Sequence, residues 1–132
     1  MLFKKVLLID DDDLDLYVSR RVLKNVGFAE VIITTHTVKD AMDYLRHNSM
    51  IGSLPDFIFL DLNMPGQNGL DFLHEYEAFA RTQHSSCIIA LLMNVVEANN
   101  GDTKLAKSHP LVKYVIEKPL TPDKLKGING PK

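Results

Sequence analysis

The sequence predicts an α/β domain in which a five-stranded parallel sheet is covered by helices on both faces. Five short apolar runs alternate with stretches whose apolar residues recur at helical spacing. The connections between these elements are short, as they are in repeated strand–helix–strand units. The apolar runs are continuous and bounded by turn-forming residues, which indicates strands that are buried on both faces.

Length and composition are those of an ordinary globular domain. The 132 residues are 45% hydrophobic and 24% charged, which suffices for a core without disulfides. The net charge of −2, without a basic stripe, argues against nucleic-acid binding. We expect no membrane span and no signal peptide. The single cysteine, Cys87, fits a reducing compartment, so we predict a cytoplasmic protein in which Cys87 is a small apolar residue opening a strand.

Polar or turn-forming residues close the first, third and fifth predicted strands. The predicted strands span residues 6–9, 31–33, 57–60, 88–92 and 112–116. Four aspartates from Asp10 to Asp13 follow the first strand. Asp61 ends the third strand, and Glu117-Lys118-Pro119 closes the fifth.

Apolar residues at helical spacing predict the helices. The predicted helices span residues 14–26, 38–45, 70–79 and 103–108, with a short last helix from Thr121. Gly27 stops the first helix, and Pro122 suits the first turn of the last. Residues 48–55 are expected to form a loop. Asp102 is the expected N-cap of the fourth helix, after a long loop that begins near Asn94.

Right-handed crossovers leave few strand orders, of which the doubly wound, flavodoxin-like order 2-1-3-4-5 is the commoner for five strands. A dinucleotide-binding fold would have a glycine-rich turn after the first strand, where this chain has four aspartates. The sequence contains no internal repeat, low-complexity tract or linker. We therefore expect residues 1–132 to form a single domain, without an output domain.

The predicted strand order brings polar side chains to one edge of the sheet. Asp10, Asp11, Asp61 and Lys118 all follow or end strands at their carboxyl ends, where open parallel sheets bind ligands. Carboxylates and waters form a hard oxygen site, which suits Mg²⁺ better than zinc or copper. A divalent cation, a carboxylate nucleophile and a lysine can together handle a phosphoryl group.

The motifs that contain these residues resemble the receiver (response-regulator) domain of bacterial two-component signalling. The matching stretches are Leu8-Ile9-Asp10-Asp11, Leu60 to Gly66 with Gly69, and Glu117-Lys118-Pro119-Leu120. The resemblance implies a stand-alone receiver that takes a phosphoryl group from a sensor histidine kinase or phosphotransfer protein. Such a protein requires Mg²⁺, signals through contact with a downstream protein partner, and has at most slow self-dephosphorylation as enzymatic activity.

The resemblance also implies a role for each matching residue. Asp61 would be the phospho-acceptor. Lys118 would contact the phosphoryl group, and the peptide bond before Pro119 would be cis. The implied Mg²⁺ ligands are Asp10, Asp11, Asp61 and the backbone carbonyl of Asn63.

Two switch positions depart from the family pattern. The Ser or Thr that ends the fourth strand of receivers falls on Leu92, or on Met93 if the strand is shifted by one residue, and neither can donate a hydrogen bond. The aromatic residue three positions before the lysine is replaced by Val115, and Tyr114 lies on the other face of its strand. The missing hydroxyl would form a charge-assisted hydrogen bond to the phosphoryl group, which contributes about 1.5–3 kcal/mol. We therefore expect weaker coupling between phosphorylation and the conformation of the protein.

The remaining acids of this region, Asp12, Asp13 and Asp15, are expected only to cap the first helix and complement its dipole. Three alternative functions stay open. Leu92 and Val115 favour a degenerate receiver that binds proteins without phosphorylation. An aspartyl-phosphate hydrolase of the haloacid-dehalogenase type would need a second acid two residues after Asp61, where this chain has Asn63. A flavodoxin is disfavoured because four aspartates would repel the flavin phosphate.

Overall fold

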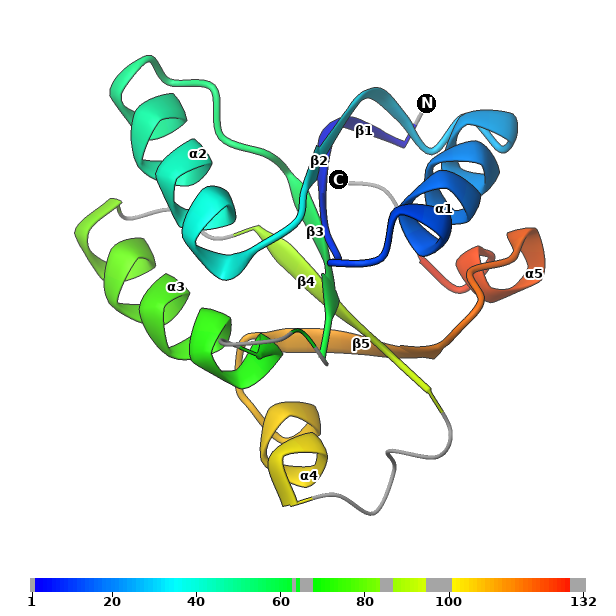
Figure 1. The fold of residues 1–132 in the computed structure, drawn as a ribbon. Coiled ribbons are helices and arrows are strands. Elements are labelled where there is room, and N and C mark those ends of the chain that lie inside the picture. The colour runs from blue at the N-terminus through cyan, green and yellow to red at the C-terminus, as the bar shows by residue number, and fades with distance from the viewer. Residues whose placement is uncertain (1, 63, 65–67, 84–86, 95–100, 129–132) are drawn as a thin grey trace.

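The computed structural model describes residues 2–62, 64, 68–83, 87–94 and 101–128, in which strands and helices alternate (Figure 1). The strands are β1 (Phe3–Ile9), β2 (Ala29–Thr35), β3 (Phe57–Asp61), β4 (Ile88–Met93) and β5 (Val112–Glu117). The helices are α1 (Asp13–Asn25), α2 (Val38–Met50), α3 (Gly69–Gln83), α4 (Gly101–Lys107) and α5 (Pro122–Leu125).

The five strands form one parallel sheet in the order β2-β1-β3-β4-β5, which confirms the predicted flavodoxin-like topology. Helices α1 and α5 lie on one face, and α2, α3 and α4 lie on the other (Figure 1). Within the described residues, no helix has the length and apolar character needed to cross a bilayer.

Alternating residues of the central strands build two separate cores. In β3, Phe57 and Phe59 pack on the side of α1 and α5, whereas Ile58 and Leu60 pack on the side of α2 and α3. All four side chains are fully buried. The β3 sequence is continuously apolar because both of its faces are covered.

Helix α2 is longer than the sequence indicated. The prediction that a loop begins at Asn48 is wrong, since the helix continues to Met50. Asn48 lies on the buried face, where its side-chain amide donates a 2.8 Å hydrogen bond to the Tyr44 carbonyl. A polar residue with a partner inside its own helix can be buried at low cost. The buried face of α2 therefore extends past Leu45, the last residue of the predicted apolar pattern.

The structure confirms the predicted starts of α1 and α5, and it differs from the prediction at the start of α4. The Asp12 carboxylate caps α1 by accepting from the N–H groups of Leu14 and Asp15, and the Thr121 hydroxyl caps α5. The predicted N-cap at Asp102 is wrong, because α4 begins one residue earlier and contains Asp102 in its first turn.

The start of α3 packs directly on the backbone that carries Asp61. The Gly69 N–H donates a 2.7 Å hydrogen bond to the Leu62 carbonyl. A Cβ atom on Gly69 would lie 3.0 Å from the Leu62 Cα and 3.1 Å from the Asp61 carbonyl oxygen. Only glycine allows this approach without moving the end of β3.

We predict that Gly69→Ala lowers the free energy of unfolding by about 1–3 kcal/mol, because the added methyl meets backbone rather than a flexible side chain. Urea denaturation measures the change. Gly127→Ala is the matched control, since a Cβ there meets nothing within 4 Å. Equal stability of the two variants would contradict the close approach.

Candidate functional site

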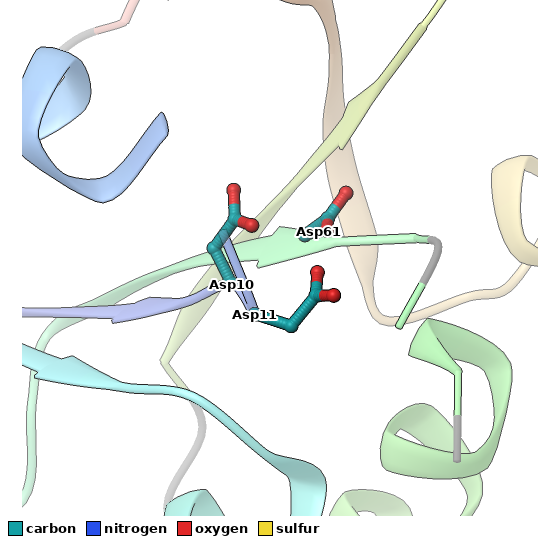
Figure 2. Close-up of side chains that lie close together, drawn as sticks. All are labelled: Asp10, Asp11 and Asp61. Carbon is teal, nitrogen blue, oxygen red and sulfur yellow. The ribbon is translucent and has the colours of Figure 1, made fainter. Parts of the chain in front are cut away.

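Three carboxylates gather where β1 and β3 end (Figure 2). One oxygen each of Asp10, Asp11 and Asp61 lies within 4.8 Å of the other two. Asp10 and Asp11 follow β1, and Asp61 is the last residue of the neighbouring β3. Asp10 and Asp61 are buried, at 3% and 4% exposure, and Asp11 is exposed. The structure therefore brings together the three acids that the sequence analysis singled out.

Lys118 reaches the same place from the end of β5. Its Nζ lies 3.0 Å from Asp10 Oδ2, 3.0 Å from Asp61 Oδ1 and 2.9 Å from Asp15 Oδ2. The Lys118 backbone N–H donates a 2.8 Å hydrogen bond to the Met93 carbonyl, which ties this segment to the end of β4. The peptide bond between Lys118 and Pro119 is cis, as the resemblance implied.

Sequence analysis missed the contact between Asp15 and Lys118. It predicted only a cap or dipole role for Asp15, which lies in the first turn of α1. A signal was nevertheless present, because helical side chains lean toward the N-terminus of their helix. The N-terminus of α1 directly follows the end of β1, so an acid in this turn can reach the carboxyl edge.

Burial and charge shift the ionisation of both central groups. Burial raises the pKa of Asp61 to about 7, and the negative charge of Asp10 adds to this rise, whereas Lys118 opposes it. Burial alone would lower the pKa of Lys118, but the contacts with the surrounding carboxylates outweigh it and raise that pKa. Lys118 is therefore held as an ammonium group, and the Asp61 carboxyl loses its proton at a higher pH than an ordinary aspartate.

The donor set fits Mg²⁺. It consists of carboxylate oxygens, one of them from the exposed Asp11, so that waters can complete an octahedral shell. In the described part of the chain, no histidine or cysteine joins this group. A divalent cation would also compensate the negative charge that raises the pKa of Asp61. Asn63, whose backbone carbonyl was predicted as a further ligand, lies outside the described residues.

The register of β4 decides which residue stands beside Asp61. Asp61 pairs with Leu92, which is buried in the core under α1, and Met93 comes one residue later, where it pairs with Glu117. Side chains at paired positions of neighbouring strands point to the same face. The neighbour of the acceptor candidate on this face therefore has no hydrogen-bond donor.

The position three residues before Lys118 is also without an aromatic ring. Val115 pairs with Leu91 and is 42% exposed. Tyr114 packs on the opposite core, with its ring stacked against Phe57 at a centroid distance of 6.2 Å. The fold therefore places Leu92 beside Asp61 and, as the sequence predicted, Tyr114 on the face of β5 opposite to Val115.

Comparison with known proteins identifies the family and the fold. The family model "Response regulator receiver domain" matches residues 6–128. The chain belongs to this family. The receiver is 32% identical over 125 residues to the probable C4-dicarboxylate response regulator DctR of Halalkalibacterium halodurans, covering 92% of this chain and 48% of that protein. It is 29% identical over 122 residues to the probable methanogenesis regulatory protein FilR2 of Methanothrix harundinacea, covering 92% and 76%.

Among solved structures, a two-component response regulator from Cytophaga hutchinsonii superposes on this receiver with a TM-score of 0.84 at 27% identity, covering 96% of this chain and 94% of that one. The chain spans about half the length of DctR and about three quarters of the length of FilR2. Receiver domains are generally non-enzymatic signalling modules that bind Mg²⁺ at an acidic cluster and interact with histidine kinases or phosphotransfer proteins.

We predict that Asp61→Asn stabilises the metal-free receiver at pH 8 by about 2 kcal/mol, roughly half of what the pKa shift alone corresponds to, because the amide also gives up the ion pair with Lys118. A carboxyl group whose pKa rises from 3.8 to about 7 on folding destabilises the protein increasingly as the pH rises through that window. The gain should therefore shrink as the pH is lowered toward 4. Urea denaturation in EDTA at several pH values measures it.

Asp43→Asn is the control for this comparison, because Asp43 is an exposed acid that pairs with Lys39 far from the cluster. Its stability difference from wild type should stay constant from pH 8 down to about pH 5, because the pKa of Asp43 is lowered by Lys39 and its contribution changes only below that pH. A gain for Asp61→Asn that is constant with pH would contradict the assigned ionisation.

Proposed function

We propose that this receiver accepts a phosphoryl group on Asp61 from a phosphohistidine of a sensor histidine kinase or phosphotransfer protein. The observation that supports this most strongly is the contact of Lys118 Nζ with Asp61 Oδ1 at 3.0 Å inside an oxygen-only acidic cluster. A nucleophile, a fixed cation and a place for a divalent metal are the requirements of phosphoryl transfer.

In the proposed step, an Asp61 carboxylate oxygen forms a bond to phosphorus while the phosphorus–nitrogen bond of the donor breaks. The electron pair of that bond leaves with the imidazole, which takes up a proton from water. Lys118 stabilises the negative charge on the phosphoryl oxygens. Asp10, Asp11 and Asp61, with the Asn63 carbonyl implied by the resemblance, would hold Mg²⁺, which would supply further charge neutralisation.

Phosphorylation would then shift the population of conformations and change the affinity for a downstream protein partner in the cytoplasm. The partner distinguishes the two conformations only if its contacts differ between them. In this proposal Asp61 turns over no substrate other than its own phosphoryl group, which it loses slowly to water.

We predict that a small acyl phosphate, such as acetyl phosphate, phosphorylates the protein in the presence of Mg²⁺ and not in EDTA. Asp61→Asn should abolish incorporation, because the amide is no nucleophile. Asp43→Asn should retain it. Intact-protein mass spectrometry detects the added phosphoryl group, and incorporation into Asp61→Asn at the wild-type level would refute the assignment of the acceptor.

The degenerate receiver is the second candidate, and the buried Leu92 beside Asp61 favours it. The same assay separates the two functions. A folded wild-type protein that binds Mg²⁺ yet takes no phosphoryl group would point to partner binding without phosphorylation.

We predict that Leu92→Thr strengthens binding of the phosphoryl mimic beryllofluoride at saturating Mg²⁺ by about ten-fold or more. The new hydroxyl would stand next to Asp61, and a charge-assisted hydrogen bond contributes on the order of 1.5–3 kcal/mol. Leu91→Thr is the matched control, since Leu91 is equally buried but faces the other core. Fluorine NMR titrations compare the affinities, and similar affinities for both variants would contradict the register argument.

A further inference from the structure

Lys118 already donates two hydrogen bonds to carboxylates that will not carry the phosphoryl group. Its Nζ donates to Asp10 at 3.0 Å and to Asp15 at 2.9 Å, and it forms an ion pair with Asp61 at 3.0 Å. An ammonium group has three N–H donors, and the lysine side chain is only 11% exposed, so water cannot surround it. A phosphoryl group on Asp61 would take over the Asp61 contact, and a closer approach of its oxygens to Lys118 would compete with the hydrogen bonds to Asp10 and Asp15.

Asp15 is the carboxylate that can leave at least cost. Asp10 and Asp61 are buried, with side chains 4% and 5% exposed, and both belong to the acidic cluster that fits Mg²⁺. Asp15 does not belong to that cluster, and its side chain is 41% exposed. A half-exposed carboxylate regains hydration when it turns outward, whereas a buried one would remain without a partner.

Charge acts in the same direction. Asp15 and a bound phosphoryl oxygen would contact the same nitrogen, which places two negative groups no more than about 6 Å apart. Like charges at this distance near a protein surface repel each other appreciably. The negative charge of Asp15 therefore stabilises the free site and destabilises the phosphorylated one.

We propose that Asp15 is a positioning residue that holds Lys118 in the unphosphorylated arrangement and competes with the phosphoryl group for it. This inference rests on the proposed function, since it assumes that Asp61 receives a phosphoryl group. It assigns Asp15 a part in setting how much of the phosphorylated form accumulates, beyond its place in the first turn of α1.

The test is the affinity for beryllofluoride at saturating Mg²⁺, measured by fluorine NMR in folded variants. Asp15→Asn should bind the mimic about five-fold more tightly than wild type, as expected for the loss of one partly exposed competing ion pair. Asp15→Glu should restore weaker binding. In a Lys118→Met background, Asp15→Asn should have a clearly smaller effect, because the group for which Asp15 competes is gone and only the direct charge repulsion remains.

Asp13→Asn is the matched control. It removes one negative charge from the same helical turn, but Asp13 pairs with His36 at 2.6 Å and does not contact Lys118. Equal affinity of Asp15→Asn and wild type, or an equal gain in Asp13→Asn, overturns the role of Asp15 and leaves the proposed function standing. If no variant binds the mimic, the proposed function fails and this inference fails with it.

Discussion

The buried ammonium group of Lys118 is the interaction on which the carboxyl edge depends. Two carboxylates, from Asp10 and Asp61, lie beneath the surface within reach of each other, and their repulsion together with burial opposes ionisation. A cation at 3.0 Å from both allows charge to persist there without solvent. The positive charge of Lys118 thus offsets the negative charges of Asp10 and Asp61. A bound metal ion or a phosphoryl group would change the net charge at this edge, and a receiver needs a site that responds in this way.

Much of this arrangement could be predicted from the sequence, because parallel strands impose it. Strands buried on both faces are continuously apolar, and right-handed crossovers leave few strand orders, of which the commoner is the one observed. Once β1, β3 and β5 are in one sheet, residues at their carboxyl ends must meet at one edge. The proximity of Asp10, Asp61 and Lys118 follows from this rule.

Other features depend on side-chain geometry that residue patterns do not contain. Helix α2 was predicted too short because Asn48 is polar, yet it continues the buried face of the helix with a hydrogen bond to the Tyr44 carbonyl. The sequence left Leu92 and Met93 as alternatives, and only the register with β3 shows that Leu92 adjoins Asp61. The contact of Asp15 with Lys118 was missed because an acid in a first helical turn has an adequate local explanation, which conceals its tertiary partner.

A crystal structure with Mg²⁺ and beryllofluoride would show whether the phosphoryl site and the metal site form together around Lys118. We expect a metal ion bound by Asp10, Asp11 and Asp61, with Lys118 Nζ on a fluorine atom and no longer in contact with Asp15. A structure in which the mimic occupies Asp61 while Lys118 keeps all three carboxylate contacts, or in which the metal binds elsewhere, would contradict this expectation.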